Sequence, residues 1–383
     1  MIRLGWVAGE PSPMRTEHLR LLAQVDDIDT TVIYAATTVQ RRSWTVDLTD
    51  AVVLGGPQLP TTRILHHDYP LTPQIWPLLS RERFDCLVVG GWSLMATQLA
   101  IVWARAHRVP YLLVSENHLR EPRPAWVRAV KSLVLRQVVP QASGHLVTGS
   151  LAREHQLHYG AAAAGIVIWP NTVDVAAFAA RAERARAERR DEVRASLGAG
   201  PDTVVVLTVG RLIPEKAFEQ LIAAVDRARA LAAHPLQLVV AGDGPLEQAL
   251  RVRAAELGVP VTFAGHVEGD RLVELYAAAD VFALVSRRET WGIVVNEAAA
   301  ASLPLVLSDR VGASVDLLVD AENGLLVRAG DVEGQARALA RLADDPELRA
   351  IFGARSRELV AGWGYERSVS ELAELVRRVA RQS

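Results

Sequence analysis

Two glutamates in one short motif are the residues best suited to chemistry in this sequence. They open and close the segment Glu289-Thr290-Trp291-Gly292-Ile293-Val294-Val295-Asn296-Glu297, which follows the apolar run 281–285. We expect Glu289 at or just before the start of a helix and Glu297 two turns inside it, about 12 Å further along. That spacing suits one carboxylate at a sugar and the other at a ribose. Because four alanines follow Glu297, its carboxylate also needs a partner.

The predicted helix start offers an anion site between the two carboxylates. Backbone amides at a helix N-terminus lack intrahelical partners and carry a positive partial charge. Gly292 removes the side chain that would block an approaching ligand. The amides expected to face the anion are those of Gly292, Ile293 and Val294.

Two cations stand in an earlier turn between a strand and a helix. The turn reads Gly210-Arg211-Leu212-Ile213-Pro214-Glu215-Lys216, and Lys216 is one of only two lysines in the chain. Gly210 permits a sharp turn and a close ligand approach. Arg211 and Lys216 would suit a diphosphate, and a lysine kept where arginine is the rule favours a compact point charge. A pair of ordinary surface charges is the alternative.

A second glycine turn, Gly242-Asp243-Gly244-Pro245, also joins a strand to a helix. Its glycines allow positive φ and close packing. Gly242 therefore has two interpretations, as part of a ligand site or as a structural turn.

The elements that must position these residues form two series of alternating strands and helices. Such alternation predicts parallel sheets covered on both faces, and ligands at the carboxyl ends of their strands. In the first series, the strands are expected at 2–8, 31–36, 86–90, 111–115 and 144–148, and the helices at 16–23, 94–106 and 126–138. In the second series, the strands are expected at 204–209, 237–241, 261–264, 281–285, 304–307 and 325–327, and the helices at 218–231, 246–257, 272–278 and 292–301.

We therefore expect an α/β protein of two doubly wound, Rossmann-like domains that face each other across a cleft. The N-terminal domain would span residues 1–172 and the C-terminal domain residues 173–364. The Ala/Arg/Glu-rich stretch that follows Asp174 is interpreted as a solvated connecting helix. The tail, 365–383, is predicted to be a further amphipathic helix.

Composition excludes several other classes of protein. The chain has 383 residues and a formal charge of -2, so nucleic acid is not expected as a partner. Its single cysteine, Cys86, lies in an apolar run and is interpreted as a core residue. We see no signal peptide and no apolar stretch of the roughly 20 residues that a membrane span needs. A cytoplasmic protein is expected.

Taken in order, the motifs of residues 204–327 resemble the retaining glycosyltransferases of family 4, the glycosyl transferases group 1, which have the GT-B fold. The resemblance also includes Phe263-Ala264-Gly265-His266-Val267, Tyr276-Ala277-Ala278-Ala279-Asp280, Leu303-Pro304 and Asn323-Gly324-Leu325-Leu326-Val327. It implies hexosyl transfer from a nucleoside-diphosphate sugar donor, with retention of configuration, to a small-molecule, glycan or glycolipid acceptor. No cofactor is implied.

The resemblance also implies roles for individual residues. Arg211 and Lys216 would hold the diphosphate. Glu289 would contact the donor sugar, and Glu297 the ribose hydroxyls. The backbone around His266 and Val267 would meet the base, and the tail helix would return to the N-terminal domain.

The N-terminal half resembles the family less closely. Glu116 stands where many members carry a histidine, and His118 follows two residues later, so either residue could lie nearest the transferred sugar. Both are candidate catalytic residues. The candidate walls of an acceptor site are His18, His66, His67, Trp92, Glu116, Asn117, His118 and Arg120.

No metal is expected at the site. Asp27-Ile28-Asp29 has the spacing of a metal motif but is interpreted as a solvated turn. Arg211, Lys216 and the helix amides would instead stabilise the leaving diphosphate. The basic segment 105–136 suggests either a peripheral membrane contact or, as preferred here, a helix packed on a sheet with a solvated basic face.

Three rival functions differ in what they require. A retaining glycoside phosphorylase of the same fold would use free phosphate and leave Glu297 without a role. A non-catalytic nucleotide-sugar-binding subunit would not need the full set of charged residues. A dinucleotide oxidoreductase is disfavoured because neither half shows a clear Gly-x-Gly-x-x-Gly turn.

Overall fold

The computed structural model describes residues 1–38, 48–59, 68–120 and 125–381. The chain forms two compact units. Unit 1 consists of Met1–Asn171 together with Tyr365–Ser383, and unit 2 of Thr172–Gly364. The chain therefore passes between the units twice, once after Asn171 and once after Gly364.

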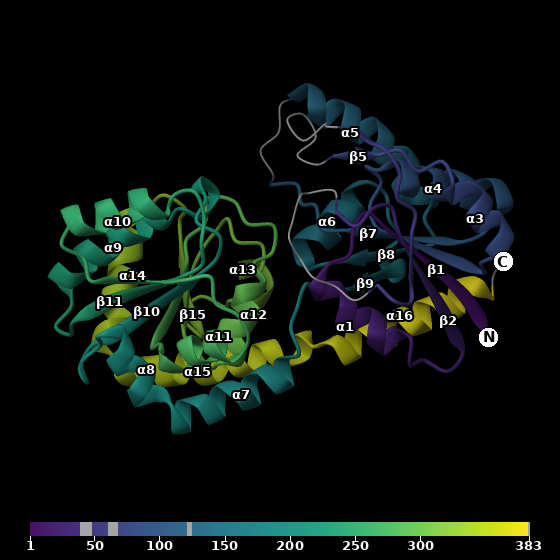
Figure 1. Cartoon of the computed structure of the whole chain (residues 1–383). Helices are drawn as coiled ribbons and strands as arrows, with labels where there is room; N and C mark the ends of the chain where they lie inside the picture. The colour runs from purple at the N-terminus through teal and green to yellow at the C-terminus, as the bar shows by residue number, and fades with distance from the viewer. Residues whose placement is uncertain (39–47, 60–67, 121–124, 382–383) are drawn as a thin grey trace. The chain divides into compact units, whose positions relative to one another are not determined.

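Unit 1 is built on a parallel sheet of seven strands in the order β3-β2-β1-β6-β7-β8-β9 (Figure 1). The strands of this sheet are β1 (Ile2–Ala8), β2 (Ile28–Tyr34), β3 (Ala51–Val53), β6 (Cys86–Val89), β7 (Tyr111–Ser115), β8 (Gly144–Val147) and β9 (Ile166–Ile168). A separate antiparallel pair joins β4 (Gln58–Leu59) to β5 (Tyr69–Pro70). Cys86 is fully buried in β6, which confirms its interpretation as a core residue.

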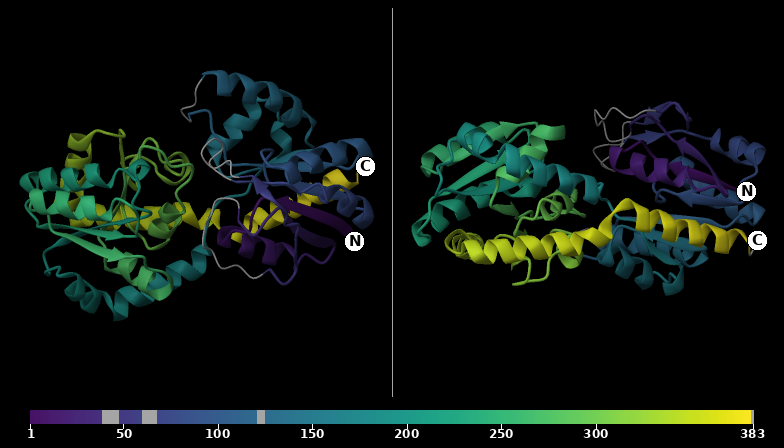
Figure 2. Two further views of the ribbon diagram at one scale, coloured as in Figure 1. Left: turned by 45° about the horizontal axis from the view of Figure 1, so that its top comes forward. Right: turned by 90° about the horizontal axis from the view of Figure 1, so that it is seen from below.

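Helices cover both faces of this sheet. They are α1 (Pro13–Leu22), α3 (Ile75–Glu82), α4 (Met95–His107), α5 (Ala125–Val138), α6 (Ser150–His158) and the C-terminal α16 (Tyr365–Ala380). Helix α16, the yellow C-terminal helix of Figure 2, has a strongly one-sided apolar face and packs on α1 and β9. Its residues Leu372 and Val376 are fully buried.

Unit 2 contains a second parallel sheet, with the strand order β12-β11-β10-β13-β14-β15. Renumbered within the unit, this is the order 3-2-1-4-5-6 of dinucleotide-binding domains. Its strands are β10 (Val204–Val209), β11 (Leu236–Ala241), β12 (Val261–Gly265), β13 (Val281–Leu284), β14 (Leu305–Ser308) and β15 (Gly324–Val327). The strand order reverses between β10 and β13, which run parallel, and ligands bind such sheets beyond the carboxyl ends of these two strands.

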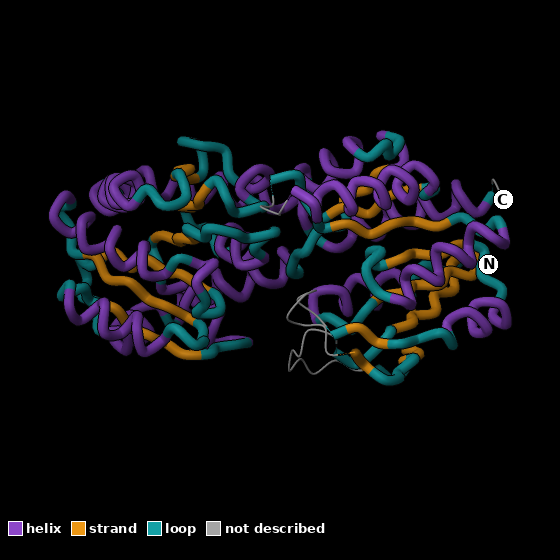
Figure 3. The backbone as a smooth tube through the Cα atoms, turned by 90° about the horizontal axis from the view of Figure 1, so that it is seen from above, coloured by secondary structure: helices purple, strands orange, loops and turns teal. Residues whose placement is uncertain are grey.

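The central strands β10 and β11 of unit 2 are buried along their whole length and are mostly apolar, because helices lie on both faces of the sheet (Figure 3). The helices are α7 (Val175–Glu188), α8 (Arg190–Leu197), α9 (Phe218–Leu231), α10 (Glu247–Glu256), α11 (Gly269–Ala278), α12 (Ile293–Ala300), α13 (Ser314–Leu317), α14 (Val332–Asp344) and α15 (Pro346–Val360). The expected doubly wound α/β architecture is confirmed.

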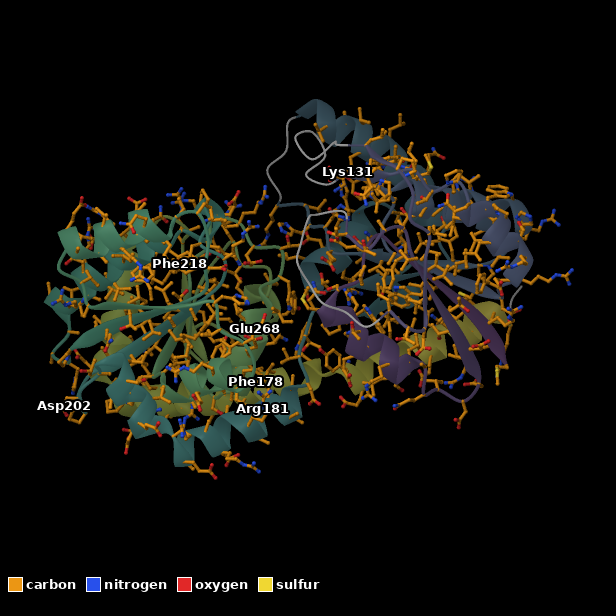
Figure 4. All side chains as sticks on the ribbon, viewed as in Figure 1. Lys131, Phe178, Arg181, Asp202, Phe218 and Glu268 are labelled. Carbon is orange, nitrogen blue, oxygen red and sulfur yellow. The ribbon has the colours of Figure 1, made fainter. Side chains whose placement is uncertain are left out.

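The interpretation of the Ala/Arg/Glu-rich stretch as a solvated connector is wrong. It forms α7 and α8, and α7 packs on α11 and α12. Phe178 and Ala182 are buried there, and the ring of Phe178 meets that of Tyr276 edge-on at 5.6 Å (Figure 4). Small alanines allow close helix packing, so a stretch with few large apolar residues still contributes to the core.

Asp280, the last residue of the Tyr276–Asp280 motif, has a structural role. Its carboxylate accepts hydrogen bonds from Arg190 at 2.5 Å and from Arg194 at 2.8 Å. It also accepts one from the backbone amide of Val205 at 2.8 Å. These bonds tie α8 to the start of β10 and lie at the strand end opposite the expected ligand site.

The interpretation of Asp27-Ile28-Asp29 as a solvated turn holds for Asp27, an exposed turn residue, but is wrong for Ile28 and Asp29, which begin a strand. Strand β2 begins at Ile28, and Asp27 receives two hydrogen bonds from Arg377 of α16, at 2.7 and 2.8 Å. Asp27 therefore ties the turn before β2 to the tail helix.

Candidate functional site

The turns that follow β10 and β11 pack backbone against backbone. A Cβ atom on Gly242 would lie 2.0 Å from the carbonyl oxygen of Gly210, and one on Gly244 would lie 2.6 Å from that of Leu212. Both glycines have positive φ. The Gly242 turn thus has a packing function that requires glycine, and it fixes the path of the loop that carries Arg211 and Lys216.

Lys216 and Glu289 form an ion pair at the point where the strand order of unit 2 reverses. Lys216 ends a short 3-10 turn after β10, and Glu289 lies in the loop after β13. The Lys216 ammonium donates to Glu289 Oε2, and each side chain is 17% exposed. A second link joins the same loops, because the backbone amide of Arg287 donates to the Glu215 carbonyl at 2.7 Å. The structure therefore brings together two residues that sequence reasoning placed on separate motifs.

The expected helical positions of the two glutamates are wrong. Helix α12 begins at Ile293, so Glu289 lies in the preceding loop and Glu297 only about one turn inside. Gly292 ends the loop with φ +93°, a left-handed conformation that the helix cannot include. A Cβ atom there would also approach the Glu289 side chain to 3.2 Å.

A third loop, after β14, holds the Glu289 backbone in place. The Glu289 amide donates to the Arg310 carbonyl at 3.1 Å, and its carbonyl accepts from the Gly312 amide at 2.9 Å. A Cβ atom on Gly312 would lie 1.9 Å from the Thr290 carbonyl oxygen. Gly312 was not predicted from the sequence, although a Val-Gly-Ala turn two residues after a buried strand is a signal that could have found it.

Glu297 has the partner that its apolar helix requires. The Tyr276 hydroxyl on α11 donates to Glu297 Oε2 at 2.7 Å. Burial raises the pKa of Glu297 to about 7, against the smaller opposing effect of the Tyr276 bond. Burial, with the nearby Glu297 charge, also raises the pKa of Tyr276 well above its usual value. Glu297 can therefore change its charge near neutral pH.

The remaining candidates of unit 2 lie on the loops at the same end of the sheet. Arg211 is exposed and forms no ion pair with any residue in the described part of the chain. His266 follows β12, is exposed, and has Nε2 2.8 Å from Glu268 Oε1. Val267 packs against the core. Ile293 and Val294 form the first turn of α12, which no side chain caps.

The unit 1 candidates separate into two groups. Trp92 follows β6, and Glu116, Asn117, His118 and Arg120 follow the neighbouring β7. Glu116 accepts a hydrogen bond from Arg15 at 3.0 Å, and Asn117 one from Lys131 of α5 at 3.1 Å (Figure 4). His66 and His67 lie outside the described residues.

His18 is not part of an exposed acceptor wall. It is fully buried and stacks on Trp169 with ring centroids 4.1 Å apart. Its Nε2 atom lies 3.0 Å from the Ser368 hydroxyl of α16. Burial lowers the pKa of His18 to about 3, so it is neutral at physiological pH. The helix expected at 16–23 includes His18, but its position on the buried face of that helix was not predicted.

No three His, Cys, Asp or Glu side chains in 1–38, 48–59, 68–120 and 125–381 gather closely enough to hold a metal ion. Over the same ranges, no helix has the length and apolar character that crossing a membrane would demand.

Comparison with solved structures places this architecture among GT-B proteins. Anabaena Alr3699/HepE, crystallised with UDP, superposes with a TM-score of 0.73 over 99% of this chain and 100% of its own, at 17% identity. Sucrose-phosphate synthase from Thermosynechococcus elongatus gives 0.71 over the whole of both chains, at 19% identity. The two sheets and their loops therefore belong to the GT-B class of folds. The expected GT-B fold is confirmed.

Sequence comparison then identifies the family. The profile of the glycosyl transferases group 1 matches residues 189–359. The chain is 31% identical over 337 residues to D-inositol 3-phosphate glycosyltransferase of Kineococcus radiotolerans, covering 82% of this chain and 71% of the relative. It is 30% identical to sulfoquinovosyl transferase SQD2 of Arabidopsis thaliana, of which it spans 55%. The chain belongs to the glycosyl transferases group 1 family and is a glycosyltransferase.

Proposed function

We propose that this chain transfers a hexosyl group from a nucleoside-diphosphate sugar to an acceptor hydroxyl, with retention of anomeric configuration and without a metal ion. The observation that carries the proposal is the Lys216–Glu289 pair at the strand-order reversal of unit 2, beside an uncapped helix N-terminus. The Lys216 cation and the Glu289 carboxylate meet there on loops that glycine contacts hold close together. Glu297 lies about one turn inside the helix that follows.

In this proposal the ion pair opens when the donor binds. The diphosphate takes the place of Glu289 at the Lys216 ammonium, with Arg211 as a second cation, and the released Glu289 carboxylate accepts hydrogen bonds from sugar hydroxyls. Glu297 accepts hydrogen bonds from the ribose. As the bond between the anomeric carbon and the diphosphate oxygen breaks, negative charge grows on the leaving group, where Lys216 and the α12 amides stabilise it. The leaving phosphate accepts the proton of the attacking acceptor hydroxyl.

The donor class can be tested by thermal unfolding of the protein with added nucleotides. Because ligands that bind only the native state raise the melting temperature, UDP or GDP and the corresponding nucleotide sugars should give a concentration-dependent rise. UDP is included because HepE was crystallised with it. A rise with inorganic phosphate and none with any nucleotide would instead favour the glycoside phosphorylase.

Catalysis separates the enzyme from a nucleotide-sugar-binding subunit. The proposed enzyme should release nucleoside diphosphate from its donor, faster when a suitable acceptor is added. Binding without any release would favour the subunit. The acceptor is proposed to lie on the unit 1 loops that carry Trp92 and Glu116, with Glu116 or His118 nearest the transferred sugar.

Metal independence gives a direct prediction. Donor turnover should be unchanged in excess chelator, because Lys216, Arg211 and the α12 amides supply the positive charge that a cation would otherwise provide. Turnover is measured as nucleoside diphosphate released before and after chelation. Activity that disappears and returns with manganese or magnesium would contradict the proposal.

A contact with anionic membrane surfaces is proposed for α5. Val130 and Leu133 of this helix are 60% and 70% exposed, and the exposed Arg136 lies beside them, whereas the sequence had favoured a solvated basic face. Apolar insertion beside cations is the pattern of interfacial helices. The protein should sediment with vesicles that contain phosphatidylglycerol.

The vesicle prediction has a matched control. The double variant Val130→Glu/Leu133→Glu should remain in solution, whereas Val102→Glu, at a 52% exposed site on α4, should sediment like the parent. Equal sedimentation of the parent with pure phosphatidylcholine and with anionic vesicles would refute the role of charge. No sedimentation at all would refute the contact.

A further inference from the structure

One tryptophan of the Glu289–Glu297 motif, Trp291, is a buried residue of the loop that carries Glu289. Trp291 is only 4% exposed, and its backbone carbonyl accepts a hydrogen bond from the Ala313 amide at 2.9 Å. Its neighbour Gly292 has the left-handed conformation that ends the loop. The position of the Trp291 ring therefore constrains the residues on both sides of it.

A buried chain of hydrogen bonds runs from this ring to the first residue of unit 2. The indole Nε1 of Trp291 donates to Asn296 Oδ1 at 3.0 Å, and Asn296 Nδ2 donates to Thr172 Oγ1 at 3.2 Å. Asn296 and Thr172 are both fully buried. A buried amide that loses one partner carries a desolvation cost, so each bond of this chain depends on the others.

The same ring also contacts the end of unit 2. Trp363, one residue before the unit ends at Gly364, packs against Trp291 with ring centroids 5.2 Å apart. Trp291 thus has partners next to both points at which the chain passes between the units.

The chain is anchored again immediately beyond these points, within unit 1. His18 stacks on Trp169 and meets Tyr365 edge-on, with centroid distances of 4.1 and 4.6 Å. Only Pro170 and Asn171 separate Trp169 from Thr172, and only Gly364 separates Trp363 from Tyr365. Few residues are therefore available to absorb a change in backbone torsion, and such a change reaches Thr172 and Trp363 directly.

We infer that Trp291 and Asn296 are positioning residues that couple the conformation of the Glu289–Gly292 loop to the two linking segments, 169–172 and 363–365. Thr172, through Asn296, and Trp363 hold the ring, in addition to the backbone bonds from the loop after β14. The consequence for nucleotide binding rests on the proposed function, whereas the coupling itself is a property of the free protein.

Hydrogen exchange of the unliganded protein tests the coupling. Thr172→Val keeps the shape of the side chain and removes the hydroxyl that Asn296 needs. It should speed exchange about tenfold at the amides that hold the loop, those of Glu289, Gly312 and Ala313. The Gly210 amide, bonded to the Ala241 carbonyl, should exchange as in the parent. Trp291→Phe should have the same effect, and the double variant should add little to either change.

The matched control is Thr262→Val. Its hydroxyl is also hydrogen-bonded within unit 2, to Gln237 at 2.9 Å and to the Leu197 carbonyl at 3.2 Å, but away from the loop. It should leave the loop amides unchanged. The inference would be overturned if the loop amides of Thr172→Val exchanged as slowly as those of the parent. It would also be overturned if the exchange rate rose equally at the Gly210 amide, or if Thr262→Val raised the exchange rate of the loop amides as much as Thr172→Val does.

Calorimetric titration with UDP and GDP, on the same variants, completes the test. Thr172→Val should bind the nucleotide about tenfold more weakly than Thr262→Val does. If the parent binds neither nucleotide, the proposed function is contradicted, while the exchange result still decides the coupling. If the parent binds and Thr172→Val binds equally well, the coupling to the site is refuted.

Discussion

Replacing Lys216 by alanine is expected to lower turnover by about two to three orders of magnitude. A desolvated cation placed where charge develops contributes roughly 3–4 kcal/mol to the transition state. Lys216 is only 17% exposed. In the free protein its charge is balanced by Glu289, so its removal also leaves a half-buried carboxylate without a partner. The lost cation and the unpaired Glu289 carboxylate both disfavour a bound diphosphate.

Two variants separate this role from a general effect of charge. Lys216→Arg should restore only part of the turnover, because a planar guanidinium on a longer stem does not reproduce a point charge. Arg227→Ala removes a cation from an exposed ion pair with Glu333 elsewhere in unit 2, and should behave like the parent. Steady-state kinetics, with folding checked by circular dichroism, gives the comparison. Unchanged turnover in Lys216→Ala would remove this residue from the donor site.

Donor affinity is expected to rise with pH through about 7, because burial raises the pKa of Glu297 to that value. Only the ionised carboxylate can accept hydrogen bonds from both ribose hydroxyls while Tyr276 donates a third. The suitable ligand is an intact nucleotide sugar, whose diphosphate does not titrate in this range. Calorimetry between pH 6 and 8 should show roughly tenfold tighter binding at the upper end.

Variants assign this pH dependence to its residue. Glu297→Gln should weaken binding and abolish the dependence, whereas Glu289→Ala should keep it and mainly slow transfer. Equal losses of nucleotide affinity in Glu289→Ala and Glu297→Ala would contradict the division of roles. A pH dependence that survives in Glu297→Gln would assign the titration to another group.

The same pKa affects the stability of the free protein in the opposite direction. Because the native Glu297 holds its proton more tightly than the unfolded chain does, the unfolded state loses its proton first as pH rises from about 4.5 to about 7. This residue therefore makes the native state less stable across that range. Glu297→Gln should flatten the corresponding part of the profile of unfolding free energy against pH.

Much of the fold could be predicted because its signal is local. Val204–Val209 is apolar except for Thr208, and the structure places β10 at those residues. The path of α7 was harder to predict, because its buried face consists mainly of alanines, which are equally suited to a solvated helix. Strand β9 is only three residues long and carries too little pattern to be recognised.

The candidate site could be predicted as a set of residues but not as a geometry. The types and order of Lys216, Glu289 and Glu297 were sufficient to propose a diphosphate and a ribose. Their contacts depend on chain segments far apart in sequence. Lys216 meets Glu289 across 73 positions, and Glu297 meets Tyr276 across 21. The places of Glu289 and Glu297 relative to the start of α12 were wrong, because the left-handed conformation of Gly292 follows from its packing against the neighbouring loops.

The most direct test of the donor site is a crystal structure of the protein with the nucleoside diphosphate that gives the larger thermal shift. The diphosphate should lie at the carboxyl ends of β10 and β13, within hydrogen-bond distance of the Lys216 ammonium and the first amides of α12. The ribose hydroxyls should contact Glu297, and the Lys216–Glu289 pair should be open. A nucleotide bound elsewhere, or one bound here with that ion pair intact, would contradict the proposed site.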